Sequence, residues 1–245
     1  MSRKERMLSP EEEDFLREMM SIGSGWAATA LTQLLQTNVE AVIPTVKVGQ
    51  PFQCLPSPIH DPDVSVTAVR MHMLGDCTGD MFFILRDRDV DLLVRQMLLV
   101  NADWLVLHGK SSGAALESAG QTWGRSEMAT SIISEMGNIL AGVYLRAIYD
   151  FCNLSIEHTT PMSANDMIQS LLDESLALAN RESASSILVE SEFGIEVSSE
   201  LVLGGGGDII VYLLLIPSAE STKVLVESIV EARALCFGTG NDSGK

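Results

Sequence analysis

Two polar side chains placed one helical turn apart, Glu135 and Asn138, are the residues of this chain best suited to act together on one external partner. Positions i and i+3 are neighbours on a helix surface, so both side chains can reach the same object. Gly142, one turn further on, leaves room for a partner to approach closely. Asparagine and glycine each cost a helix interior roughly 0.5–1 kcal/mol relative to alanine. Because the helix keeps both residues despite this loss of helix stability, we expect the face that carries them to contact a partner.

Other patterns that carry chemistry are weaker in this sequence. The glycines of 204–207 lack the Lys-Ser/Thr that follows a phosphate-binding loop, so they predict a flexible hairpin. The serines have no His/Asp partner pattern, which argues against a serine hydrolase. The histidines have none of the spacings typical of metal ligands; they are His60, His72, His108 and His158. We therefore expect this chain to bind no cofactor or metal.

The motif around Glu135 has a second copy earlier in the chain. At an offset of 117 residues, Glu18–Gly25 lies over Glu135–Gly142, with glutamate, methionine, isoleucine and the final glycine coinciding. The same offset pairs Pro44 with Pro161. The chain is therefore predicted to be a duplicated unit with a pseudo-two-fold relation.

A further match sets Gly79–Leu85 against Gly207–Leu213 at an offset of 128. The larger offset requires eleven extra residues between Pro161 and Gly207. We expect these residues to belong to an additional helix, residues 164–180.

The elements that position these residues repeat in the same order. Ser9 before Pro10 and three glutamates predicts the capped start of a helix. Helices are expected at 10–36, 87–99, 126–151, 164–180 and 219–234, and strands at 41–48, 64–73, 80–86, 154–160, 187–202 and 208–216. The predicted fold class is α/β (α+β), with a mixed sheet of about six strands, two long helices packed on it and shorter helices.

The duplicated halves are expected to share one core. We predict a single domain at 8–236, made of half-repeats 8–106 and 122–236, with a frayed tail at 237–245.

On each long helix, one apolar stripe is expected to be buried and the motif stripe to lie beside it. The expected buried residues are Phe15, Met19, Ile22 and Trp26 in the first helix, and Ile132, Met136, Ile139 and Val143 in the second. From the residues alone, the repeated motif marks either a face that binds a partner or packing between helices within the fold.

Composition narrows the function classes. The 245 residues carry 16 Lys+Arg against 33 Asp+Glu, a formal net charge of −17. Such a chain is repelled by phosphate backbones and anionic lipid surfaces, so no nucleic-acid partner and no membrane insertion are expected. The start of the chain lacks an apolar signal core, and the four scattered cysteines are typical of reduced thiols. These features predict a cytoplasmic protein.

The repeated segments, Glu18–Leu35 and Glu135–Ala147, resemble the signature of the CheC family of chemotaxis proteins, whose relatives include CheX and the FliM middle domain. The resemblance covers about Glu11 to Ala234. It implies a signal-transduction hydrolase, a protein phosphatase that removes the phosphoryl group from the phosphoaspartate of a CheY-type response regulator. It also implies that Asn138 orients the attacking water and that Glu135 docks on the receiver lysine. The Mg²⁺ of the reaction would belong to the receiver.

The first copy of the motif departs from the family pattern, because Ser21 stands where the active copy has asparagine. A hydroxyl is shorter and lacks the paired acceptor and donors of an amide. Glu18 and Ser21 are therefore expected to form a degenerate second site.

Three alternatives to a phosphatase remain. They are a non-enzymatic regulator that binds CheD, a FliM-like flagellar switch module, and a dimerisation module whose long helices are buried between chains. The intact Glu135/Asn138 pair favours the phosphatase.

Overall fold

The computed structural model describes residues 8–49, 64–100, 127–179, 186–197 and 209–237. The helices are α1 (Pro10–Leu35), α2 (Asp87–Val100), α5 (Glu127–Cys152), α6 (Ile168–Ala179) and α7 (Ala219–Phe237). The strands are β1 (Val39–Ala41), β2 (Thr45–Gly49), β3 (Ser65–Gly75), β4 (Gly79–Arg86), β5 (Ile156–His158), β6 (Met162–Met167), β7 (Ser186–Ile195) and β8 (Ile209–Pro217). Across these ranges, no helix combines the length and the apolar character that crossing a bilayer requires.

The eight strands form one sheet with the order β1-β7-β8-β4-β3-β5. β2 follows β1 along β7, and β6 follows β5 along β3, so the strands fill six positions across the sheet. The predicted fold class is confirmed, but the expectation of a mixed sheet is wrong, since every described ladder is antiparallel. The two halves meet at β4 and β8, where a pseudo-two-fold axis makes the neighbouring strands antiparallel.

The two halves exchange their first strands. β1 and β2 of the first half pair with β7 of the second, while β5 and β6 pair with β3 of the first. Each half therefore completes the sheet of the other. The hairpin expected at 204–207 lies outside the described residues, and α7 runs one residue into the segment expected to be a frayed tail.

The duplication is closest in the long helices. α1 and α5 both have 26 residues and begin 117 residues apart. Each is followed by a residue in the left-handed region, Gln36 at φ 49° and Asn153 at φ 53°. The expected cap of α1 is present, since Ser9 Oγ accepts from Glu12 N while Glu12 Oε2 accepts from Ser9 N.

The sheet register corrects the expected offset of the later strands. Val46 pairs with Val189, and its equivalent Ser163 pairs with Val69, so Val69 and Val189 are equivalent at an offset of 120. α2 begins at Asp87 and α7 at Ala219, an offset of 132 and not 128. The extra residues therefore lie mainly between β7 and β8. α6 is a helix as predicted, but the residues from 164 to 167 belong to β6.

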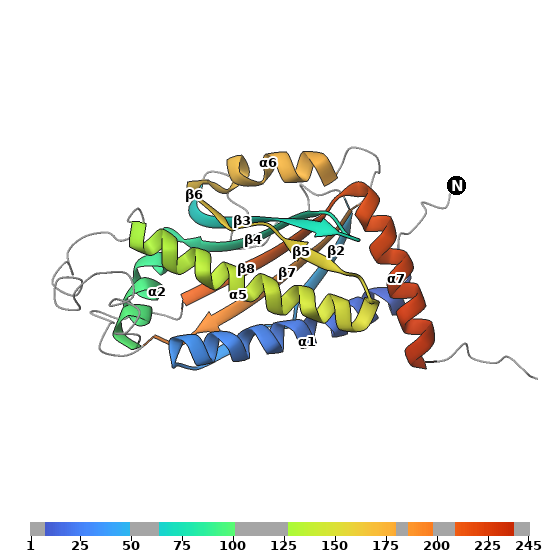
Figure 1. Cartoon of the computed structure of the whole chain (residues 1–245), viewed down its shortest axis with the longest axis horizontal. Coiled ribbons are helices and arrows are strands. Elements are labelled where there is room, and N and C mark those ends of the chain that lie inside the picture. Colours follow the sequence, from blue (N-terminus) through green and yellow to red (C-terminus); the bar gives the residue numbers. More distant parts are fainter. Residues whose placement is uncertain (1–7, 50–63, 101–126, 180–185, 198–208, 238–245) are drawn as a thin grey trace, which may run out of the picture.

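The sheet lies between two helical layers (Figure 1). α1 and α5 lie side by side on one face, and α6 covers part of the other. α1 and α5 are antiparallel, because Met19 contacts Cys152 while Gly23, further along α1, packs on Ala147, which precedes Cys152 in α5. The larger core fills the α1–α5 face of the sheet, and the smaller core lies under α6.

The buried stripes of the long helices match the expected ones only in part. Phe15, Met19, Ile132 and Met136 are buried as predicted. Ile22 is half-buried and Trp26 is 40% exposed, and in α5 Ile139 and Val143 are also only half-buried. The helices instead bury small side chains against each other; in α1 these include Gly23, Ser24, Ala27 and Ala28. The expected stripe was chosen from the spacing of large apolar side chains. Closely packed helices bury small side chains instead, so the buried stripe is rotated around the helix relative to the expected one.

A buried hydroxyl cluster ties this helix pair to the sheet. The Tyr144 hydroxyl contacts Ser191 on β7 and lies 3.3 Å from Ser24 Oγ. Ser24 Oγ also donates to Ser191 Oγ at 3.2 Å. Burial raises the pKa of Tyr144 above its ordinary value, so the phenol stays neutral and can donate a hydrogen bond.

Two glycines of α1 test the helix contact. A Cβ at Gly23 would lie 3.0 Å from Ala147 Cβ, whereas one at Gly25 would meet nothing within 4 Å. We expect Gly23→Ala to lower the free energy of unfolding by about 1–3 kcal/mol, because the Ala147 Cβ is fixed to a helix backbone. The matched control Gly25→Ala should raise it by about 0.5–1 kcal/mol through helix propensity. Urea unfolding measures both, and equal effects would contradict this packing.

Candidate functional site

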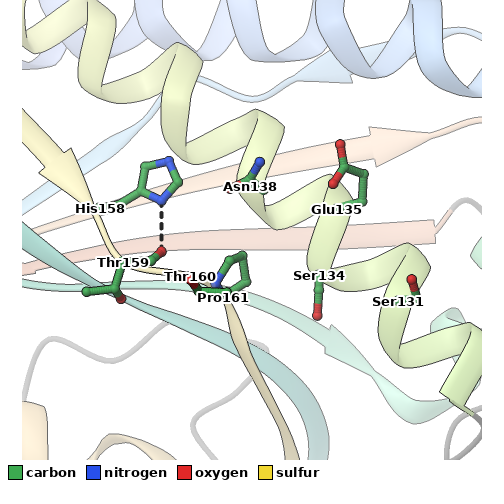
Figure 2. A pocket seen from close by; sticks show the side chains of 8 residues that line it. All are labelled: Ser131, Ser134, Glu135, Asn138, His158, Thr159, Thr160 and Pro161. Carbon is green, nitrogen blue, oxygen red and sulfur yellow. Dashed lines mark hydrogen bonds between the residues drawn. The ribbon is translucent and has the colours of Figure 1, made fainter.

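Glu135 and Asn138 line an open cavity of about 480 Å³ between α5 and the segment that joins β5 to β6 (Figure 2). We call it the α5–β5 cavity. The α5 wall consists of Ser131, Ser134, Glu135 and Asn138, and the opposite wall of His158, Thr159, Thr160 and Pro161. The antiparallel pairing of β5 and β6 with β3 holds the second wall in place.

The two predicted catalytic side chains are available to an external partner. Glu135 is exposed and Asn138 half-buried, and within the described part of the chain neither has a hydrogen-bond or ion-pair partner. Their neighbours Met136 and Gly137 are buried and hold this turn of α5 against the sheet, where the Cβ position of Gly137 lies 3.2 Å from Val69. The space beside Gly142 is open, as expected for a docking face.

His158 faces α5 from the other wall. Its Nδ1 lies 3.0 Å from the Thr159 carbonyl oxygen, drawn as a dashed line in Figure 2. A carbonyl can only accept, so Nδ1 carries the hydrogen and Nε2 remains free to gain a proton. This contact fixes the ring plane at the edge of the cavity.

The first half presents a different surface at the equivalent place. Glu18 and Ser21 lie on α1 at the positions of Glu135 and Asn138. The positions of Ser131 and Ser134 hold Asp14 and Arg17, which form an ion pair at 2.5 Å.

The second wall changes from polar to apolar in the first half. Ala41, Val42 and Ile43 stand at the positions of His158, Thr159 and Thr160. Val42 is 50% exposed and Ile43 72% exposed. Every described residue that lines the α5–β5 cavity comes from the second half.

Sequence reasoning missed the residues that surround the motif. The spacing of His158 matches no metal-ligand pattern, and no local pattern marks Ser134, Thr159 or Thr160. Extending the 117-residue comparison beyond the motif would have found them, because Ser134 lies over Arg17 and His158 over Ala41. The histidine at 72 contacts Asp80 instead, with Nδ1 2.6 Å from Oδ1. His60 and His108 lie outside the described residues.

Comparison with known proteins now identifies the family. The family model described as CheC-like family matches residues 128–163, a stretch that contains all eight residues of the α5–β5 cavity. The "CheY-P phosphatase CheC" of Bacillus subtilis is 30% identical over 184 residues, which are 75% of this chain and 80% of the relative. The chain belongs to the CheC-like family.

Solved structures share the fold at low sequence identity. FliY of Thermotoga maritima superposes with a TM-score of 0.57 at 18% identity, covering 93% of this chain and 100% of that one. The FliM middle domain of H. pylori superposes with a TM-score of 0.53 at 9% identity, covering 90% and 99%. The CheC-like architecture is therefore shared with flagellar proteins.

No group of three or more His, Cys, Asp or Glu side chains in the described ranges is arranged to hold a metal ion.

Stability measurements separate a binding site from structural packing. We expect Glu135→Ala to change the free energy of unfolding by less than about 0.5 kcal/mol, because its exposed side chain has no hydrogen-bond or ion-pair partner among the described residues. Asn138→Ala should raise it by about 0.5 kcal/mol, since alanine is the better helix former. The control Met136→Ala, fully buried on the same turn, should lower it by about 2–5 kcal/mol. A clear loss of stability in Asn138→Ala would show that the motif serves packing.

Proposed function

We propose that this protein is a chemotaxis phosphatase that hydrolyses the phosphoaspartate of a phosphorylated CheY-type receiver, in the cytoplasm where such receivers act. One observation carries the proposal: Glu135 and Asn138, unpartnered within the described chain, face an open cavity inside the segment that matches the CheC-like family. The name of the Bacillus subtilis relative supports the same activity.

Asn138 would orient the attacking water. In the reaction the water oxygen attacks phosphorus, the bond to the aspartyl oxygen breaks, and inorganic phosphate and a free carboxylate result. A loose phosphoryl-transfer transition state needs positioning more than covalent help. The amide oxygen accepts from the water while the NH₂ group donates nearby, and neither brings charge into an anionic site. The receiver, as the substrate, supplies its own Mg²⁺.

Glu135 would dock the receiver by pairing with the lysine next to its phosphoryl group. Its exposed carboxylate lies one helical turn from Asn138, so one receiver face can meet both. At the first-half position, the Asp14–Arg17 ion pair adjoins Glu18 and replaces the two serines that stand beside Glu135. Ser21 is also too short to replace the amide. We therefore assign catalysis to the second half and treat Glu18/Ser21 as degenerate.

A binding role without catalysis is the second candidate. The first half exposes the large apolar side chains of Trp26, Val42 and Ile43, which are 40%, 50% and 72% exposed. Such side chains fit a protein partner better than a phosphoryl group. A CheD-type deamidase or a flagellar switch component would be such a partner.

The deciding experiment measures the phosphoaspartate lifetime of the CheY-type receiver from the same organism. The receiver is phosphorylated with acetyl phosphate in Mg²⁺, and phosphate release is followed with and without the protein. We expect wild type to shorten the lifetime and Asn138→Ala to remove about 100-fold of that acceleration, the typical cost of misplacing a reactant by about 1 Å. Ser21→Ala should behave as wild type.

An unchanged lifetime with wild type would contradict the phosphatase proposal and favour the binding role. Equal losses in Ser21→Ala and Asn138→Ala would contradict the assignment to the second half alone.

A further inference from the structure

We infer that His158 is a positioning residue for the anionic, phosphoryl-bearing face of the receiver, and that its protonated imidazole supplies the positive charge of the α5–β5 cavity. The inference rests on the proposed function and adds to it a residue that sets receiver affinity as a function of pH.

The charge inventory of the cavity singles out His158. The eight lining residues comprise one carboxylate, one amide, four hydroxyl groups, a proline and this imidazole. Among the described lining residues there is no lysine or arginine, so of these only His158 can carry a positive charge. An approaching phosphoryl group meets the Glu135 carboxylate in the same cavity, and the protein as a whole carries a formal charge of −17. A nearby cation therefore favours docking.

The nearest described arginine along α5 is already engaged. Arg146 pairs with Asp150 at 2.8 Å and lies over the Tyr149 ring at 5.6 Å. It lies eight residues beyond Asn138, about 12 Å along the helix. Arg146 therefore does not replace His158 at the cavity wall.

The hydrogen bond to Thr159 fixes the position of the His158 ring, so protonation would change the charge of the ring but not its position. Because Nδ1 donates to the Thr159 carbonyl at 3.0 Å, the proton is gained or lost at Nε2. In the protonated form Nε2 becomes a charged donor, which forms the stronger class of hydrogen bond with phosphate oxygens. In the neutral form it is an acceptor and offers the phosphoryl group nothing.

Of the ionisable side chains near His158 in the described structure, Glu135 is the one that lines the same cavity. On β3, its ladder partner is Met73, which does not ionise. Glu157 precedes it on β5 and therefore points to the opposite face. His72 also lies on the other face of β3 from Met73, where it contacts Asp80. Among the described lining residues, Glu135 and His158 are the two with ionisable side chains.

The duplication gives independent support. The half that holds Asn138 also holds the histidine, whereas the half that holds Ser21 has Ala41 at that position. Backbone pairing is the same at both places, since β1 pairs with β7 as β5 pairs with β3. The imidazole is therefore not needed to build the strand, and it accompanies the intact motif.

The test compares kcat and kcat/KM for dephosphorylation of the acetyl-phosphate-treated receiver from about pH 5.5 to 8.5. Receiver autodephosphorylation is subtracted at each pH, and each variant is divided by wild type on the same receiver. We expect wild-type kcat/KM to exceed that of His158→Ala by about two- to fivefold at the acidic end, the size of one partly solvated charge interaction. The ratio should approach one at the alkaline end, with kcat unchanged.

Two further variants keep the result interpretable. His158→Lys should hold the acidic-end kcat/KM of wild type across the range, because its charge does not titrate there. His72→Gln removes an imidazole on the other face of the sheet and should keep the wild-type profile.

A constant ratio of wild type to His158→Ala at every pH, or equal losses of kcat and kcat/KM, would overturn the inference while leaving the phosphatase intact. Absence of any acceleration by wild type would instead contradict the proposed function.

Discussion

The close antiparallel contact between α1 and α5 is the constraint on which the rest of the structure depends. At Gly23 a single methyl group would come within 3.0 Å of Ala147, so the two helices meet almost backbone to backbone. The Ser24, Tyr144 and Ser191 hydroxyls fasten this pair to β7. Because α1 and α5 are equivalent 26-residue helices, their contact displays two copies of one surface. The motif stripes are what this packing leaves uncovered.

The backbone around the motif is arranged in the same way in both halves, and only the side chains differ between them. The second half combines an amide, a carboxylate and an imidazole around an open cavity. The first half places Arg17 and the exposed Val42 and Ile43 at the corresponding positions. Under the proposed function, the second-half arrangement would meet the phosphorylated receiver and the first-half arrangement an apolar protein surface. Duplication followed by divergence of the wall residues explains how one scaffold presents a polar cavity in one half and exposed apolar side chains in the other.

The sequence predicted the features that depend on local chemistry or on the repeat itself. The capped start of α1, the two long helices and the exposure of Glu135 follow from residue type and spacing. The antiparallel order and the exchanged strands could not be predicted, because they depend on pairing between distant segments. The buried stripe was misplaced at Trp26 because small residues, with no apolar signal of their own, make the helix contact. His158 was missed because its role depends on the fold bringing it opposite α5.

The proposed function makes one central claim: side chains, and not the backbone, distinguish the proposed catalytic half from the first half. Transplanting the second-half residues into the first half tests it most directly: Arg17→Ser, Ser21→Asn and Ala41→His together, in an Asn138→Ala background. The account predicts that phosphoaspartate hydrolysis returns in this variant, at a rate well above that of Asn138→Ala alone. Hydrolysis no faster than with Asn138→Ala, in a protein with unchanged unfolding behaviour, would contradict it.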